Sequence, residues 1–536
     1  MKSDRQADMI IRGGAVIDGT GEHGRPADVA IEGGNIAAVG DLDGWRAETV
    51  LRATGLTVAP GFIDMHTHSD LALLLNPRAE SKLRQGVTTE VIGQCGYSPA
   101  PAPAGRREAI RSHFGAWGQE VTWTWGSFGD YVSALRENGT SVNVVPVVGH
   151  SIVRAGVMGE DNRSASETDL AQLREAVAQA LSEGAFGLST GLIYAPGMFA
   201  DTDELVAVAE TLSPVGGIYF SHIRSENTAL HEAIYEAIEI GRRAGVRVHI
   251  SHLKAEGRAN WGQTERVLAA IDKARTEGVD VGFDVYPYDA WNTSLAQLLP
   301  AWARVGGAAE IIGRLTDGET RARLLAEIAA EAEADPGRWG RRLLSSVTTD
   351  ANRPLQGQTL AAIAEERGCS APEVVLDLLV EERLDAGMVG FAMCEDDVRR
   401  VLSHPLATIG SDSASQAPYG ILGESHPHPR TYGTFARVLG HYARDEQLFS
   451  LEEGVAKMTS RAADRLGLSD RGRLVPGAAA DIVVFDADTV SDAATYENPH
   501  QYARGIRWVI VNGVVELDGE HHQDRRPGQV LPPPGQ

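Results

Sequence analysis

Residues that can bind a metal ion recur where short apolar segments of this chain end. The segment GFIDMH ends in His66, His68 follows two positions later, and TTEVIGQC ends in Cys95. Side chains two residues apart on an extended chain project to the same side, so His66 and His68 can face one site. A histidine pair alone says little, and a lone cysteine is usually a buried apolar residue. Their meaning depends on what the other segment ends carry.

Three further segment ends carry the same kinds of residue. SHIRSE contains His222, SHLKAEG contains His252 thirty residues later, and IGSDS contains Asp412. Thiolate, imidazole and carboxylate together are donors for divalent metal ions, and zinc is the best match to a cysteine with two histidines. Five segment ends that share such residues predict a metal site.

The arrangement of apolar segments predicts how these residues meet. Eight such segments alternate with helical stretches, which is typical of an α/β fold of the (β/α)8 barrel type, here placed at residues 61–470. The carboxyl ends of the strands in such a barrel form the site where chemistry occurs. The segments are 61–66, 88–95, 142–149, 185–190, 217–222, 246–251, 281–286 and 406–411.

Two regions depart from the alternation of strands and helices. About 120 residues separate the seventh and eighth segments, which is more than one crossover needs, so a lid-like subdomain inserted at about 290–350 is predicted. Short strands with Gly and Asp turns fill residues 1–60 and return at 471–536. These two ends of the chain are predicted to form one small β-sandwich domain.

Composition limits the classes of partner. The net charge is −24 without a basic stripe, which argues against nucleic acid. No apolar run reaches the ~20 residues that span a bilayer, so no membrane partner is expected. Three cysteines in 536 residues argue against a disulfide framework and favour a reducing, cytoplasmic setting. The oligomeric state stays open between a monomer and a small homo-oligomer.

Longer motifs carry a specific resemblance. PGFIDMHTHSD, the paired SH(I/L) segments and the terminal SDS resemble the metal-dependent amidohydrolase superfamily, whose members combine this barrel with a β-sandwich built from both chain ends. Binuclear members commonly bridge their metals with a carboxylated lysine on the fourth strand, but AFGLSTGLIY contains no lysine. With EVIGQCGYSPAP, SHLKAEG, DVYPY and HPRTYGTFARVLG, the chain resembles the N-acyl-D-amino-acid deacylases (D-aminoacylases) over about residues 8–520.

This resemblance implies a metal arrangement. Cys95, His222 and His252 would hold one tight Zn²⁺, and the Cys95 thiolate would supply the negative charge that relatives obtain from a modified lysine. His66, His68 and Asp412 would line a second, weaker metal position. Asp412 would be the catalytic residue that takes a proton from water and passes it to the leaving amine.

The resemblance also implies a small-molecule substrate, an N-acyl-D-amino acid that is hydrolysed to a carboxylate and a free D-amino acid. Its α-carboxylate would bind Lys254, Arg430, Tyr194 and Tyr286. His150, at the end of the third segment, is a further candidate for substrate binding, with a structural role as its alternative. Hydrolysis of D-residue dipeptides or of cyclic amides, as in hydantoinases and dihydroorotases, remains an alternative, as does a non-catalytic scaffold.

Overall fold

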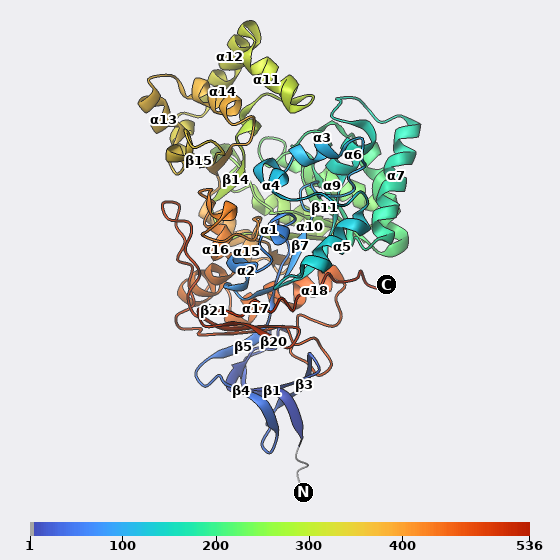
Figure 1. Ribbon diagram of the computed structural model, residues 1–536, viewed down its shortest axis with the longest axis vertical. Coiled ribbons are helices and arrows are strands. Elements are labelled where there is room, and N and C mark those ends of the chain that lie inside the picture. The colour runs from blue at the N-terminus through green and yellow to red at the C-terminus, as the bar shows by residue number, and fades with distance from the viewer. Residues whose placement is uncertain (1–4, 536) are drawn as a thin grey trace.

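The computed structural model describes residues 5–535. A β domain, a barrel and an inserted subdomain follow one another along the long axis of the molecule (Figure 1). The barrel lies between the other two, so its open end can be covered by the insertion. Within the described residues, no helix combines the length and apolar character that crossing a membrane requires.

Eight parallel strands form the barrel. They pair in chain order, and the backbone N–H of Met65 donates to Ile409 O at 3.1 Å, which closes the ring between its first and last strands. The third strand is interrupted at Val147. The strands are β6 (Phe62–Asp64), β7 (Val87–Ile92), β8 with β9 (Asn143–Pro146 and Val148–Gly149), β10 (Gly187–Gly191), β11 (Ile218–His222), β12 (Arg247–Ile250), β13 (Val281–Val285) and β17 (Ala407–Ile409).

Helices cover the outside of the barrel because each has one apolar face. In α9 (Leu230–Ala244), Ile234, Ile238 and Gly241 are buried at helical spacing, and Gly245 ends the helix in the left-handed conformation that glycine adopts readily. Ser166 begins α7 (Glu167–Ser182) with a capping box to Asp169. The other long outer helices are α5 (Phe128–Asn138), α10 (Thr264–Thr276), α15 (Glu395–Ser403) and α17 (Leu451–Met458).

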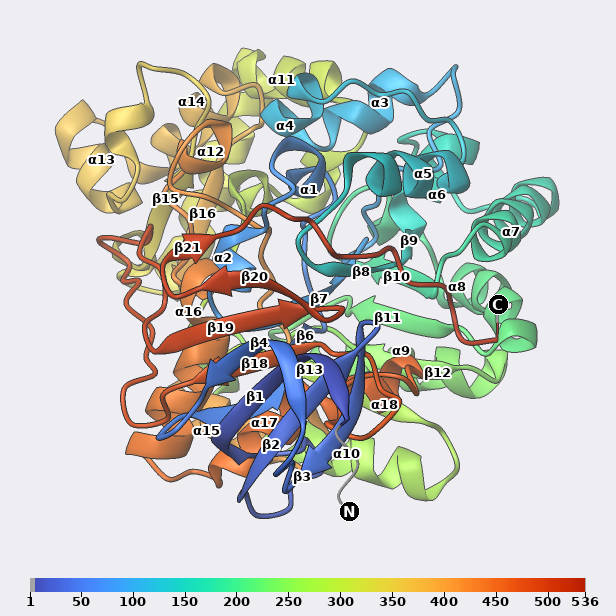
Figure 2. The ribbon, with the colours of Figure 1, turned by 60° about the horizontal axis from the view of Figure 1, so that its bottom comes forward.

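Both ends of the chain build the β domain, as Figure 2 shows. Antiparallel pairing of β5 with β18 joins the two halves into one nine-stranded sheet. The predicted fold class, a (β/α)8 barrel with a β domain from both chain ends, is confirmed. The N-terminal strands are β1 (Gln6–Val16), β2 (Arg25–Glu32), β3 (Asn35–Gly40), β4 (Arg46–Arg52) and β5 (Thr57–Pro60), and the C-terminal ones are β18 (Ile482–Phe485), β19 (Ile506–Val511), β20 (Val514–Asp518) and β21 (His521–His522).

The last residues depart from the predicted boundary of the β domain. The backbone of Val144 in β8 donates to Gln529 O at 2.8 Å and accepts from Leu531 N at 2.9 Å. The segment around 529–531 therefore lies against the barrel and not within the β domain, although it belongs to the predicted range 471–536. Its sequence, rich in Pro and Gly, has no alternation that would indicate a strand-like partner.

The insertion is longer than the predicted range of about 290–350. Its three-stranded antiparallel sheet has the order β14-β16-β15, so it is complete only at Phe391. A separate apolar core extends from Leu295 to Met388. The sequences of its later helices resemble those of ordinary crossover helices, so they do not indicate that the insertion extends beyond residue 350. The elements are β14 (Ala290–Ser294), α11 (Ala308–Thr316), α12 (Gly318–Ala334), β15 (Arg342–Ser346), α13 (Leu360–Arg367), α14 (Ala371–Glu381) and β16 (Gly387–Phe391).

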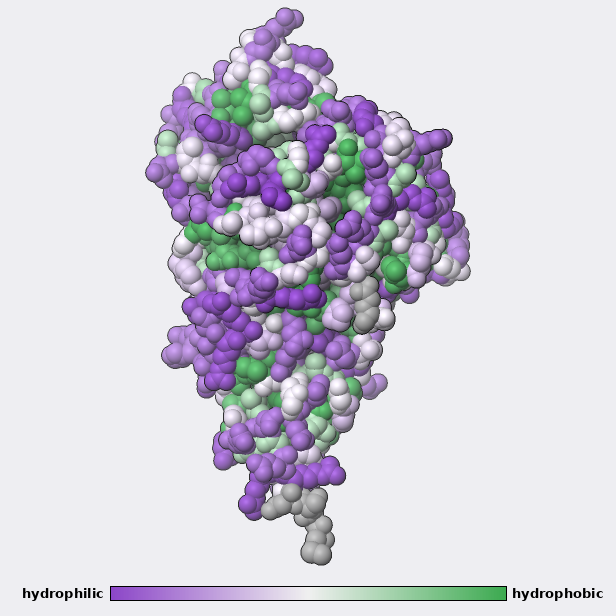
Figure 3. All heavy atoms as spheres, turned by 45° about the vertical axis from the view of Figure 1, so that its right-hand side comes forward, coloured by the Kyte–Doolittle hydropathy of each residue, from purple (hydrophilic) through white to green (hydrophobic). Residues whose placement is uncertain are grey.

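The face of the molecule in Figure 3 is largely polar, with apolar residues in separated patches. This agrees with the net charge of −24. The chemistry-bearing residues are instead gathered inside, at the end of the barrel nearest the insertion.

Candidate active site and metal centre

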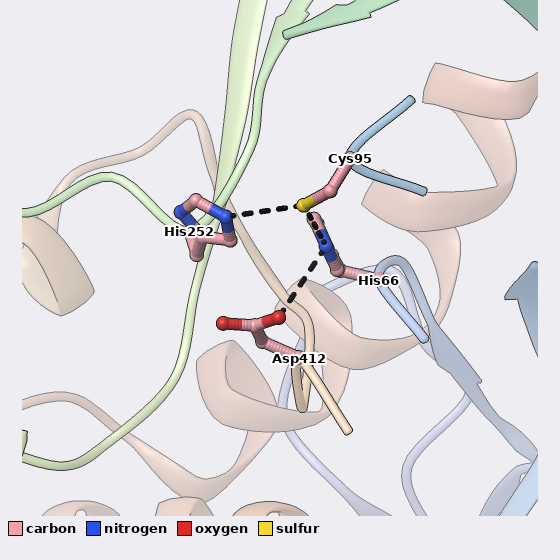
Figure 4. A group of neighbouring side chains, drawn as sticks. All are labelled: His66, Cys95, His252 and Asp412. Atoms are coloured by element: carbon pink, nitrogen blue, oxygen red, sulfur yellow. Dashed lines mark hydrogen bonds and ion pairs between the residues drawn. The ribbon is translucent and has the colours of Figure 1, made fainter. Parts of the chain in front are cut away.

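Side chains from four strand ends converge on one point (Figure 4). His66, Cys95, His252 and Asp412 are all buried, and their potential ligand atoms lie within 4.8 Å of one another. The Sγ of Cys95 is 3.3 Å from Nε2 of His66 and 3.5 Å from Nε2 of His252. The same His66 nitrogen is 3.5 Å from Oδ1 of Asp412.

The other two predicted ligands join this cluster. Nδ1 of His222 lies 3.5 Å from Cys95 Sγ, and Nε2 of His68 lies 3.1 Å from Asp412 Oδ1. The structure thus brings together all six residues that the sequence analysis predicts as metal ligands.

The donor geometry around Cys95 fits zinc. Tetrahedral zinc with bonds of about 2.3 Å to sulfur and 2.0–2.1 Å to nitrogen separates these donors by ~3.6 Å. The two distances from Cys95 Sγ, to His222 Nδ1 and to His252 Nε2, are both 3.5 Å. Three donors of this type leave a fourth tetrahedral position for water or substrate.

Electrostatics favour the thiolate form of Cys95. Burial alone would raise the pKa of this thiol, but neighbouring His66 and the hydrogen bonds with His222 and His252 bring its pKa well below the ordinary value. A thiolate is the form of cysteine that binds a metal ion.

Three of these residues have an unusual backbone. Cys95, His252 and Asp412 have φ angles of 54°, 35° and 51°, in a region that non-glycine residues rarely adopt. Two hydrogen bonds support this conformation: Asp412 N donates to His66 O at 2.9 Å, and His252 N donates to Asp284 Oδ1 at 2.9 Å. Left-handed turns at the strand ends therefore direct these side chains into the site.

Asp284 on β13 is a site residue that the sequence analysis missed. Its Oδ2 is 3.5 Å from Nδ1 of His66 and 3.1 Å from Nε2 of His249, and its Oδ1 accepts the backbone N–H of His252. A carboxylate behind a ligating histidine fixes the orientation of the ring. Only its place in the motif DVYPY, beside Tyr286, could have pointed to it.

Asp412 forms an ion pair with an arginine. Nη1 of Arg430, at the start of α16 (Arg430–Arg437), lies 2.8 Å from Asp412 Oδ2. Burial alone would raise the pKa of Asp412, but Arg430 and His252 bring its pKa well below the ordinary value. These contacts therefore favour the ionised form of Asp412, which is the form that can accept a proton.

Donors suited to a substrate carboxylate surround Arg430. Its guanidinium carbon lies 4.7 Å from the ring centre of Tyr286, whose buried hydroxyl has no hydrogen-bond partner among residues 5–535. The hydroxyl of Tyr194 is 2.9 Å from Thr293 Oγ1, and its ring packs edge-on at 5.1 Å against His222. Lys254 Nζ donates to Glu226 Oε1 at 2.6 Å.

His150 has a different surrounding. It begins α6 (His150–Met158), and its Nε2 is 3.1 Å from Oε1 of Glu204, which also accepts from Arg154 Nε at 3.0 Å. Glu204 belongs to α8 (Thr202–Ala209) on the outside of the barrel. These contacts fit the structural alternative for His150 and not a place in the cluster.

A buried lysine joins the strand ends that carry His66 and Asp412. Lys82, in α2 (Glu80–Leu83), has a fully buried side chain. Its Nζ donates to Asp64 Oδ2 at 2.9 Å, to Ser413 O at 3.0 Å and to the hydroxyl of Ser411. One cation therefore holds the end of β6 to the loop after β17.

Replacing this lysine should destabilise the fold. Lys82→Met leaves the Asp64 carboxylate buried without its cation, and loss of one partner of a buried ion pair costs about 3–5 kcal/mol. Urea unfolding should show that loss in the free energy of unfolding. Lys273→Met is the matched control, since the Lys273 side chain is 76% exposed on α10. Equal stability of the two variants would contradict a central role for Lys82.

The fold and this cluster together define a metal-dependent barrel enzyme. The model of the amidohydrolase family matches residues 49–515, and the chain belongs to this family.

Relatives match nearly the whole chain. An N-acyl-D-glutamate deacylase of Alcaligenes xylosoxydans xylosoxydans is 39% identical over 525 residues, 98% of this chain and 96% of the relative. A D-aminoacylase of the same organism is 39% identical over 531 residues, 99% of each. The solved structure of an N-acyl-D-glutamate deacylase from Bordetella bronchiseptica, with zinc and a phosphonate mimic of the tetrahedral intermediate, matches with a TM-score of 0.82 at 34% identity, over 98% of this chain and 100% of that chain.

Proposed function

We propose that the protein is a zinc-dependent hydrolase that cleaves N-acyl-D-amino acids to a carboxylate and a free D-amino acid. The observation that carries the proposal is the set of donors from Cys95, His222 and His252 at zinc-like spacing, beside the Asp412 carboxylate. The full-length relatives that are named as deacylases of N-acyl-D-amino acids support the substrate class.

In the proposed reaction, a metal ion and the Asp412 carboxylate have different roles. Zinc bound by Cys95, His222 and His252 would polarise the acyl carbonyl and lower the pKa of the attacking water. Asp412 accepts the proton of this water and then donates it to the leaving amine. Arg430, 2.8 Å away, keeps the carboxylate ionised between turnovers.

The substrate carboxylate binds where hydrogen-bond donors gather around Arg430. Arg430 offers a planar guanidinium, and Tyr286 a buried hydroxyl without a partner among the described residues. Lys254 and Tyr194 complete this group from the neighbouring strand ends. Because both the carboxylate and the scissile amide are then fixed, inverting the α-carbon exchanges the side chain with hydrogen, and only one enantiomer fits. The names of the full-length relatives support the D form.

His66, His68 and Asp412 form a second, weaker metal position in this proposal. The distance of 3.1 Å between His68 Nε2 and Asp412 Oδ1 supports this position. The second position shares Asp412 with the proton transfer, so a metal ion bound there would compete with the role of this carboxylate as a base.

Cyclic amides are the less supported substrates. β10 (GLSTG) contains no lysine that could bridge two metals in the manner of the binuclear members. A non-catalytic scaffold would not need buried ionised groups at zinc-like spacing, because such groups cost stability. Cys95, Cys369 and Cys394 form no disulfide, which suits a reducing compartment that we take to be the cytoplasm.

Stereospecific amine release tests the function. The zinc-loaded protein should release leucine from N-acetyl-D-leucine and leave N-acetyl-L-leucine intact. N-acetyl-D-glutamate and N-acetyl-D-aspartate, tested in parallel, would define the preferred side chain. Preference for the L form would overturn the stereochemical assignment, and activity only on D-residue dipeptides or cyclic amides would establish the alternative.

A further inference from the structure

Glu226 follows His222 by four residues in the loop after β11 and lies against both histidines of the tight zinc site. Its carboxylate also contacts Lys254. We propose that Glu226 is a positioning residue that fixes the ring orientation and the tautomer of His222 and His252 and holds Lys254 for the substrate. The inference rests on the proposed zinc site and deepens it.

His252 presents its two nitrogens to different partners. Nε2 lies 3.5 Å from Cys95 Sγ, and Nδ1 lies 3.0 Å from Oε1 of Glu226. A neutral histidine that binds zinc through Nε2 carries its proton on Nδ1, which must then donate to an acceptor. Glu226 is placed to be this acceptor, so it selects the tautomer that binds zinc.

His222 uses its nitrogens in the opposite order. Nδ1 faces Cys95 Sγ at 3.5 Å, and Nε2 lies 4.0 Å from the other oxygen of Glu226, Oε2. That Nε2 atom is buried and has no hydrogen-bond partner among the described residues. A small rotation of the carboxylate towards His222 would complete the pair. Each carboxylate oxygen thus serves one histidine.

Lys254 is the third residue that contacts the Glu226 carboxylate. Its Nζ is 2.6 Å from Glu226 Oε1 and 2.7 Å from Nδ1 of His252. The ammonium of Lys254 cannot donate to Nδ1 of His252 when that nitrogen already carries a proton. When zinc is bound to Nε2 of His252, both Lys254 Nζ and His252 Nδ1 must therefore donate to Glu226.

The backbone fixes Glu226 in this place. Its carbonyl oxygen accepts the N–H of Glu256 at 2.7 Å, which joins the loop after β11 to the loop after β12. His252 and Lys254 precede Glu256 in that second loop. Glu226 therefore couples the two strand ends through its backbone and its side chain together.

Zinc affinity provides a test that does not depend on the substrate. Competition with a chromophoric chelator should show that Glu226→Ala binds zinc about 10–100-fold more weakly, the usual cost of losing an outer partner of a ligating histidine. Glu226→Gln should bind with intermediate affinity, because its amide oxygen still accepts from one histidine but carries no charge. At saturating zinc, both variants should show a higher KM for N-acetyl-D-leucine because Lys254 is no longer held.

Glu256→Gln is the matched control. Glu256 lies nearby, but its carboxylate faces Arg342 at 3.7 Å, so its removal should change zinc affinity less than about twofold. Thermal unfolding of the metal-free proteins identifies any variant that has lost its fold, and the Gln variant then carries the test. Wild-type zinc affinity in a folded Glu226→Ala or Glu226→Gln protein would overturn the inference. An equal loss in Glu256→Gln would also overturn it, because general negative charge would then explain the effect.

Discussion

Asp412→Asn lowers kcat for N-acetyl-D-leucine by about 10²–10⁴-fold, the usual contribution of a general acid–base group, while the tight zinc remains bound. Asparagine keeps the size of the side chain but cannot accept the proton of water. The tight site survives because its donors come from Cys95, His222 and His252. Steady-state kinetics and zinc analysis of the same preparation would measure both effects.

Asp289→Asn is the control for this substitution. Asp289 lies three residues after Tyr286 in the loop after β13, and its carboxyl group is not among those of the described metal cluster. The control should therefore keep most of its turnover. Near-normal turnover by Asp412→Asn would remove Asp412 from the proton transfer, and loss of the tight zinc would make it a structural ligand instead.

Cys95→Ser should lower zinc affinity by more than the 10–100-fold that loss of an outer partner costs, because it removes a direct ligand. Serine is close to cysteine in size, but its hydroxyl does not ionise near neutral pH and is a poor zinc ligand. The site also loses the negative charge that the three histidines around Cys95 stabilise. Turnover should fall in parallel at zinc concentrations that saturate the wild-type protein.

Cys369→Ser separates this effect from the general loss of a thiol. Cys369 packs against the core of the insertion, away from the barrel cluster. It should bind zinc and turn over substrate as the wild type does. If Cys95→Ser kept wild-type zinc affinity, the thiolate would not be a ligand and His66 would have to replace it.

The sequence predicted the barrel and the cluster because both follow simple rules. Apolar segments mark buried parallel strands, and the carboxyl ends of these strands must meet at one end of a barrel. The segment 217–222 ends at the same residue as β11, His222, whereas Cys95 lies three residues beyond the end of β7. Cys95 still joins the cluster, as predicted, because a left-handed turn at this residue directs its side chain into the site.

The sequence does not predict which charged residues are buried. Each of three such residues forms an ion pair with a residue from another part of the chain: Lys82, Asp284 and Glu226. No periodicity within their own segments distinguishes them from surface charges. His150 shows the converse: its position at a strand end indicated the site, but a helix begins at that residue and aims the ring at Glu204. Strand position alone does not determine where a side chain points.

Zinc titration of the metal-free protein tests the central claim most directly. N-acetyl-D-leucine hydrolysis, measured after each addition, should rise with bound zinc and reach its maximum at one zinc per chain, with N-acetyl-L-leucine unchanged throughout. This result would place catalysis in the site formed by Cys95, His222 and His252. Full activity without zinc, or activity that appears only when a second zinc binds, would contradict it.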